Sequence, residues 1–265
     1  MSKVINKVFN KSCTHMNELQ PNQVDLVVTS PPYFNLKEYS SWDTYEDHLD
    51  WLKIVFTEVY RVMRPGSWIC WNIQVCLPNK SDTATERMGC HPLLADTICI
   101  MREVGFWYEK DIIWYKGKGT ATQKLFGSYP NPSLLLISGL TEHIITARKP
   151  MGKKPARKRD PDIVEKSKIT KEEWGAWAVD FWEIPPVPSS YTKHPAPYPV
   201  ELAERCIRLN SFVDDLVLDP FMGSGTTALA AQRAKRNYVG YELNEDYIES
   251  IQSKLDKNTD LFADV

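Results

Sequence analysis

The chain has 265 residues and a mass of 30.5 kDa, with 43% hydrophobic and 25% charged residues. This globular composition excludes a disordered, collagen-like or coiled-coil protein, and the length suits one large α/β domain. The 32 basic and 34 acidic residues give a net charge of −2. That balance excludes a protein that coats nucleic acid by bulk charge, but it allows an enzyme with a local basic patch.

The six cysteines and five histidines are dispersed, and no Cys-x-x-Cys pair occurs. The spacing predicts neither a zinc site nor a disulfide framework, and reduced thiols favour a cytoplasmic protein. The first residues lack an apolar core with a cleavage site, and no run of about 18 apolar residues occurs. We therefore expect no signal peptide and no membrane span.

The first half of the chain predicts strands that alternate with helices. Apolar residues at 49, 52, 56, 59 and 63 recur at helical spacing within a helix at 45–64, which Asp43 or Thr44 can cap and Pro65-Gly66 ends. The other predicted elements are strands at 24–30, 67–73, 106–116 and 142–148 and a helix at 91–104. Residues 117–140 are predicted to be mostly loop.

Residues 149–190 differ from the rest in composition. Seven bases and no acid occur within 148–159, and Trp174, Trp177 and Trp182 follow before a proline-rich stretch. This pattern predicts an insertion or a mobile module. Regular alternation then returns, with helices at 199–209, 226–235 and 244–255 and strands at 216–219 and 238–242. The whole pattern predicts a mainly parallel, doubly wound sheet.

A glycine turn that follows a predicted strand is the strongest cofactor signal. Residues 215–231 read DLVLDPFMGSGTTALAA, and the next predicted strand ends in Glu242. Glycines allow close approach of a ligand, the helix start offers free N–H groups, and the acid suits ribose hydroxyls. Gly225 is not followed by Lys, which excludes a P-loop, and a third dinucleotide glycine is missing. S-adenosylmethionine fits this pattern, and a ligand-free turn is the alternative.

The segment Ser30-Pro31-Pro32-Tyr33 directly follows a predicted buried strand, at the sheet edge where α/β folds bind ligands. The Ser30 hydroxyl and the Pro31 carbonyl can accept both N–H bonds of a planar exocyclic amine, which frees its delocalised lone pair. Tyr33 can stack on the ring that carries the amine. A rigid turn with a surface tyrosine is the alternative interpretation.

The two motifs occur in an unusual order, because the SPPY segment precedes the glycine turn. After the strand that ends at Glu242, only a helix and a tail remain, so a doubly wound sheet would lack one strand. Residues 4–9 can supply it. The order therefore predicts a circularly permuted sheet.

On these motifs the sequence resembles the beta-group DNA amino-methyltransferases, which methylate the exocyclic nitrogen of cytosine or adenine. TSPPY matches their catalytic motif, DPFMGSGTT matches their cofactor motif, and the order of the two marks the beta group. YRVMRPGSWICWNI, FGSYPNP with EHIITARKP, and HPAPYPVELAERCI resemble three further family segments. The resemblance implies a Rossmann-like, S-adenosylmethionine-dependent methyltransferase fold with a circularly permuted mixed sheet.

The resemblance also implies roles for individual residues. Ser30, Pro31, Pro32 and Tyr33 would hold a base that is flipped out of duplex DNA. The cofactor would contact Asp219, Phe221, Gly223, Ser224, Gly225, Thr226, Glu242, His194 and Pro195. Two segments depart from the family pattern: Lys11-Ser12-Cys13 stands where Gly-Asp is usual, and Tyr198 stands where Lys is usual.

The leading Ser30 favours methylation of cytosine N4, with adenine N6 as the alternative. No proline is followed by Cys, which argues against attack by a cysteine and methylation of cytosine carbon 5. An RNA or protein-amide methyltransferase is less favoured, because those usually have Asn-Pro-Pro-Tyr after the cofactor motif. A non-catalytic DNA-binding module is less favoured because both loops are retained.

The resemblance divides the chain into a catalytic half at 1–148, a target-recognition insertion at 149–190 and a cofactor-binding half at 191–265. The residues expected to contact DNA phosphates are Arg148, Lys149, Lys153, Lys154, Arg157, Lys158 and Arg159. A solvated loop is the alternative for this basic run. The implied partners are double-stranded DNA, a second subunit and a cognate restriction endonuclease, with no metal.

Overall fold

The computed structural model describes residues 4–34, 42–78, 90–117, 139–152, 157–187 and 198–262. Its main sheet contains β1 (Lys7–Phe9), β2 (Val24–Thr29), β3 (Met63–Ile73), β6 (Trp107–Tyr115), β7 (Thr141–Arg148), β8 (Phe181–Glu183), β9 (Leu216–Asp219) and β10 (Asn237–Tyr241). A separate ribbon contains β4 (Leu77–Pro78) and β5 (Cys90–His91). The helices are α1 (Tyr45–Val62), α2 (Leu93–Val104), α3 (Pro161–Lys166), α4 (Lys171–Trp177), α5 (Val200–Asn210), α6 (Thr226–Arg233) and α7 (Glu245–Phe262).

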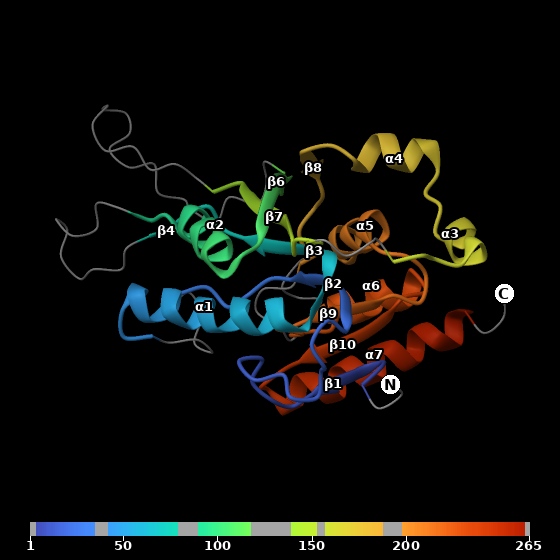
Figure 1. The fold of residues 1–265 in the computed structure, drawn as a ribbon, viewed down its shortest axis with the longest axis horizontal. Helices are drawn as coiled ribbons and strands as arrows, with labels where there is room; N and C mark the ends of the chain where they lie inside the picture. Colours follow the sequence, from blue (N-terminus) through green and yellow to red (C-terminus); the bar gives the residue numbers. More distant parts are fainter. Residues whose placement is uncertain are drawn as a thin grey trace.

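The main sheet has the strand order β1-β10-β9-β2-β3-β7-β6-β8. Neighbouring strands are parallel except that β7 runs antiparallel to both β3 and β6. Figure 1 shows the blue N-terminal strand β1 beside the orange β10, where residues 7–9 pair with residues 239–241. The predicted mixed α/β sheet is confirmed, and the N-terminal segment supplies its missing strand.

Helices cover both faces of the sheet, with α1 and α2 on one face and α5, α6 and α7 on the other (Figure 1). The strand β2 shows why two cores form. Val27 packs in the core beneath α1 and α2, whereas Leu26 and Val28 pack in the core beneath α5 and α6. Because successive side chains of a strand point to opposite faces, an uninterrupted apolar strand needs a cover on each side.

The chain reverses its winding direction between β9 and β2. From β9 it passes through α6 to β10 on one side, and from β2 it passes through α1 to β3 on the other. The carboxyl ends of β9 and β2 therefore meet at a topological switch point, where open α/β sheets bind their ligands. The predicted catalytic and cofactor loops both begin there.

The boundary between α1 and β3 differs slightly from the prediction. Thr44 caps α1 through a capping box with Asp47, as one of the two expected caps. The helix ends at Val62, and β3 begins at Met63, although Pro65 and Gly66 were expected to separate them. The proline lacks an N–H, and the register with β2 shifts at this point, so the strand passes Pro65 as an irregularity.

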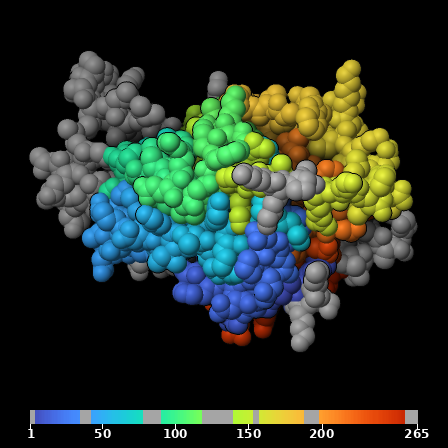
Figure 2. All heavy atoms as spheres, in the orientation of Figure 1, coloured from blue at the N-terminus to red at the C-terminus, as the bar shows by residue number. Residues whose placement is uncertain are grey.

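Two short helices and an edge strand lie in the segment predicted as an insertion. Residues 157–187 cover one flank of the molecule, shown in yellow to gold in Figure 2. The strand β8 pairs in parallel with β6, and Trp182 is 1% exposed and belongs to the core beneath α5 and α6. The last part of this segment thus completes the main sheet. None of the described helices is both long and apolar enough to cross a membrane.

Candidate active site

A cavity of about 530 Å³ lies at the carboxyl ends of β2 and β9. Its size falls in the range of small-molecule sites. The predicted site residues that line it are Ser30, Pro31, Pro32, Tyr33, Phe221, Gly223, Ser224, Thr226 and Glu242. The two loops, far apart in the sequence, therefore form one site.

The catalytic loop begins where β2 ends, and Ser30 is the first residue after the strand. Its Oγ accepts a hydrogen bond of 3.3 Å from Asn72 Nδ2 and lies 3.4 Å from the Tyr33 hydroxyl. Pro31 and Pro32 have no N–H and fix their own φ angles, so the chain leaves the sheet in a rigid turn. This turn presents the Ser30 hydroxyl to the cavity.

A histidine supports the catalytic loop from below. His48 of α1 is 1% exposed, and its Nε2 lies 3.4 Å from the Pro32 carbonyl oxygen. Burial lowers the pKa of His48 to about 4. The neutral ring therefore donates through Nε2, and Nδ1 is buried without a hydrogen-bond partner among the described residues. Trp42 and Trp51 pack against the same ring.

The cofactor loop is fixed to the tip of β10 by Glu242. The Gly223 N–H donates a 2.7 Å hydrogen bond to Glu242 Oε2, and the Asn244 N–H donates a 2.8 Å bond to Oε1. Gly225 has φ +80°, and a Cβ there would lie 2.8 Å from Ile251 of α7. Each Glu242 oxygen keeps acceptor capacity for a further donor, such as a ribose hydroxyl.

Asp219 holds the two loops together from beneath. Its carboxylate accepts hydrogen bonds from the Thr29 and Thr227 hydroxyls and from the Phe221 N–H at 3.0 Å. The Tyr198 hydroxyl also donates to it, at 3.3 Å. Burial raises the pKa of Asp219 to about 6, against the lowering effect of these hydrogen bonds.

Not every residue expected at the cofactor lines the cavity. Asp219 and Gly225 do not line the cavity. Asp219 accepts the Phe221 N–H, and Gly225 allows the loop to turn close to Ile251. His194 and Pro195 lie outside the described residues, as does the FGSYPNP segment. Lys11, Ser12 and Cys13, to which no contact was assigned from the sequence, line the cavity.

The sequence analysis missed several polar residues of the cavity, among them three that contact one another. Asn72 lies near the end of β3, Lys116 follows β6, and Glu142 is the second residue of β7. Asn72 Nδ2 donates a 2.6 Å hydrogen bond to Glu142 Oε2, and Lys116 forms an ion pair with Glu142 Oε1. For Asn72 the available signal was a polar side chain near the end of the apolar run in β3.

A comparison with known families matches the part of the chain that forms this site. A family model described as a DNA methylase matches residues 24–253, a range that includes both loops and β10. The chain belongs to this DNA methylase family. The order of its motifs, catalytic before cofactor, is that of the beta-group amino-methyltransferases, as the sequence predicted.

Individual relatives of this DNA methylase are similar over nearly its whole length. The Type II methyltransferase M.MthZI of Methanothermobacter thermautotrophicus is 30% identical, over 99% of this chain and 80% of that protein. The DNA adenine methyltransferase YhdJ of Escherichia coli (strain K12) is 28% identical, over 94% and 82%. The structure of TTHA0409 from Thermus thermophilus, complexed with S-adenosyl-L-methionine, has 30% identity and a TM-score of 0.78, over 96% and 94%.

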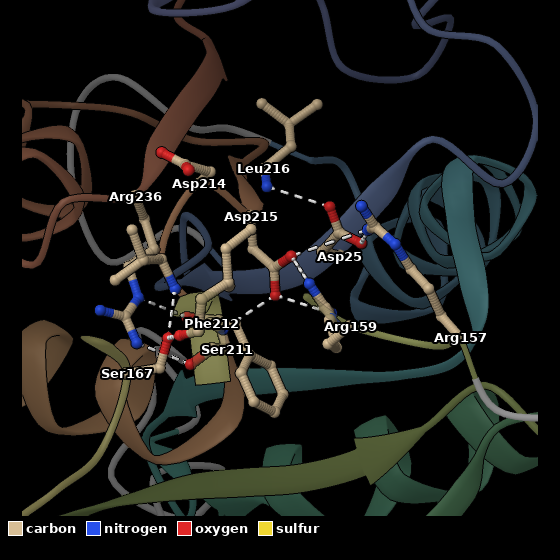
Figure 3. Close-up of polar contacts among 12 residues, drawn as sticks. Asp25, Arg157, Arg159, Ser167, Ser211, Phe212, Asp214, Asp215, Leu216 and Arg236 are labelled. Atoms are coloured by element: carbon tan, nitrogen blue, oxygen red, sulfur yellow. Dashed lines mark hydrogen bonds and ion pairs between the residues drawn. The ribbon is translucent and has the colours of Figure 1, made fainter. Parts of the chain in front are cut away.

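Most of the described bases expected to bind DNA are engaged within the protein. Arg157 lies 3.0 Å from Asp25, and Arg159 Nη2 donates a 2.9 Å hydrogen bond to Asp215, as Figure 3 shows. Further bases have other partners: Arg148 pairs with Glu109, and Lys149 donates to the carbonyls of Tyr60 and Met63. Lys158 is exposed, and Lys153 and Lys154 lie outside the described residues.

Arg157 and Arg159 lie at the edge of the main sheet opposite the cavity. Asp25 is the second residue of β2, and Asp215 directly precedes β9, so both carboxylates mark the amino ends of these strands. The cavity lies at the carboxyl ends, about 13 Å away along a four-residue strand. Arg148, Lys149, Arg157 and Arg159 thus have partners within the protein. Their contact with DNA phosphates stays a prediction.

Proposed function

We propose that this DNA methylase transfers a methyl group from S-adenosyl-L-methionine to the exocyclic N4 of a cytosine in a specific sequence of double-stranded DNA. The observation that carries the proposal is that Ser30 and Glu242 face one cavity, from the carboxyl ends of β2 and β10. Ser30 is an acceptor for an amine, and Glu242 is an acceptor for a ribose.

The methyl donor is S-adenosyl-L-methionine, and the residues present fit it. The Glu242 carboxylate is held in place by two backbone N–H groups and remains able to accept from hydroxyls. Phe221 and Trp51, whose ring centroids are 5.5 Å apart, line the cavity and offer an apolar surface to a flat ring. The cofactor supplies an electrophilic methyl group on a sulfonium.

The chain's own residues position the acceptor nitrogen. In this mechanism the Ser30 hydroxyl and the Pro31 carbonyl accept the two N–H bonds of the amine, which directs the nitrogen lone pair toward the methyl group. The ring of Tyr33 stacks on the base, which must leave the duplex to enter the cavity. Orientation of two bound reactants then provides most of the rate enhancement, without a covalent enzyme intermediate.

Adenine N6 is the alternative target. A neutral serine can accept an N–H from either base, and the relative YhdJ carries the name of an adenine methyltransferase. The preference for cytosine depends on Ser30 leading the SPPY motif, as the resemblance implied. Four further expectations stay predictions. They are a second subunit, a cognate endonuclease, the role of the insertion at 149–190 in target recognition, and a cytoplasmic location.

Mass spectrometry of nucleosides from plasmid DNA of expressing cells tests the proposal. N4-methylcytosine is the expected product, N6-methyladenine would establish the alternative, and neither product would refute both. Ser30→Ala should abolish most of the product. Ser67→Ala is the matched control, because it removes a serine hydroxyl that bonds to the Val24 carbonyl and does not line the cavity.

A further inference from the structure

One wall of the cavity carries a connected set of polar side chains, and the proposed function gives no role to three of them, Asn72, Lys116 and Glu142. The set contains Ser30 and Tyr33 of the catalytic loop, Asn72 near the end of β3, Lys116 directly after β6 and Glu142 near the start of β7. Glu142 is at the centre of the set and is only 8% exposed. The hydrogen bonds from Asn72 and Tyr33 and the ion pair with Lys116 offset the cost of burying this carboxylate.

The hydrogen bonds of this set run in one direction. Asn72 Nδ2 donates to Ser30 Oγ at 3.3 Å and to Glu142 Oε2 at 2.6 Å, which uses both of its hydrogens. Since Ser30 Oγ accepts from Asn72, its own hydrogen is free to point to the Tyr33 hydroxyl, 3.4 Å away.

The hydrogen bonds from Ser30 to Tyr33 continue to a carboxylate, and we call this series the path. The Tyr33 hydroxyl donates to Glu142 Oε2 at 3.3 Å. Lys116 pairs with the other oxygen, Oε1, so Oε2 is the one that faces Tyr33. The hydrogens therefore point from Ser30 to Tyr33 to Glu142. The distance of 3.4 Å between the Ser30 and Tyr33 oxygens is long for a hydrogen bond, but catalytic hydrogen bonds are often long before substrate binds.

The proposed reaction needs an exit for a proton. When the amine nitrogen takes a methyl group it becomes positively charged, and one N–H proton must leave to give the neutral methylamine. Ser30 Oγ keeps one lone pair for an N–H of the amine after it accepts from Asn72 and donates to Tyr33. The start of the path thus touches the group that must lose the proton.

We propose that Glu142 receives this proton through Ser30 and Tyr33, an inference that depends on the proposed function. The N–H bond breaks as a Ser30 O–H bond forms, and its electron pair returns to the nitrogen. The original Ser30 proton moves to the Tyr33 oxygen, and the Tyr33 proton moves to Glu142 Oε2. No oxidant or reductant is involved. Glu142 acts through Tyr33 and is a positioning residue for the catalytic Ser30, since it needs no contact with the base.

A double-mutant cycle of Tyr33→Phe and Glu142→Gln tests the path. Tyr33→Phe keeps the ring and removes only the hydroxyl. Single-turnover methylation of duplex DNA, with cofactor prebound, is measured in water and in heavy water. Each variant should slow the step by about 10- to 100-fold, and the double variant should be no slower than the slower single variant. The solvent isotope effect of the wild type should vanish in both, with unchanged cofactor affinity.

Tyr115→Phe is the matched control, because Tyr115 lies in β6 beside Lys116 but stacks on Phe181 and does not line the cavity. It should methylate at the wild-type rate. Wild-type rates in Tyr33→Phe, or strictly additive losses, would overturn the path while the proposed function stands. If Glu142→Gln does not fold, the rate and isotope effect of Tyr33→Phe decide alone. A wild type that methylates no DNA would instead refute the proposed function.

Discussion

The Thr29 hydroxyl donates a hydrogen bond of 2.5 Å to Asp219 Oδ1, across 190 positions of sequence. Thr29 ends β2 and Asp219 ends β9, so this bond joins the two strand tips from which the catalytic and cofactor loops depart. Both side chains are 1% exposed. The bond fixes one loop relative to the other, because neither residue can find water as an alternative partner.

The buried Asp219 should make stability depend on pH. Its folded pKa of about 6 lies above the ordinary value of 3.8, so its stabilising contribution is complete below pH 3.8 and is lost as pH rises through 6. Between pH 4.5 and pH 8 the loss is about 2 kcal/mol. In Asp219→Asn this dependence should disappear from the free energy of unfolding in urea. Asp214→Asn, at an exposed neighbouring aspartate, should keep the wild-type dependence. Parallel curves for Asp219→Asn and the wild type would contradict the assignment.

His48 should produce the opposite dependence. Its folded pKa of about 4 lies below the ordinary value of 6.5, so its contribution is complete above pH 6.5 and is lost as pH falls toward 4. The loss between pH 7.5 and pH 5 is about 2 kcal/mol. His48→Gln should therefore be less sensitive to acid than the wild type in urea unfolding at these two pH values. His15→Gln, at an exposed site, is the control. A variant as acid-sensitive as the wild type would refute the role of His48.

Gly225→Ala should weaken the cofactor site. The residue has φ +80°, and the new Cβ would lie 2.8 Å from Ile251. The backbone conformation alone costs an L-residue about 1–2 kcal/mol, and relief of the crowding would displace the loop. We expect weaker S-adenosyl-L-methionine binding by calorimetry and a lower melting temperature. Gly175→Ala, in α4 with open space around it, should instead stabilise by up to about 1 kcal/mol. Unchanged cofactor affinity in Gly225→Ala would count against the loop's role.

Arg159→Ala should reduce stability without reducing DNA affinity. Arg159 and Asp215 form a largely buried ion pair, with side-chain exposures of 19% and 3%. Removal of Arg159 leaves the Asp215 carboxylate with only Arg157 at 3.8 Å and the Phe212 N–H at 2.8 Å. The free energy of unfolding should fall by about 2 kcal/mol, less than for a carboxylate left with no partner. The slope of DNA affinity against salt should not change, because Arg159 lies at the edge away from the cavity. Lys168→Ala, which breaks an exposed pair with Glu165, should be nearly neutral. A slope reduced by about 1 would show a phosphate contact after all.

Local patterns predicted most of the elements that carry the site. The strand at 216–219 was predicted at its observed bounds, and the helix at 45–64 differs by two residues. These signals are local, since they come from apolar periodicity and from glycine and proline at the ends. The helices α3 and α4 were missed because each is short and has no buried residue, so the sequence shows no apolar stripe at helical spacing there.

The sequence by itself determined the fold class, the two loops and the family, because TSPPY, DPFMGSGTT and their order are continuous in the chain. Only the tertiary structure decided which charges are available and which polar groups share the cavity. The basic run at 148–159 predicts a DNA contact, and only the structure shows that Arg157 pairs with Asp25 and Arg159 with Asp215. Glu142 and Asn72 gained their importance in the same way, since they meet only when β3 and β7 pair. Ion pairing and burial depend on contacts between distant segments, and sequence spacing does not encode those contacts.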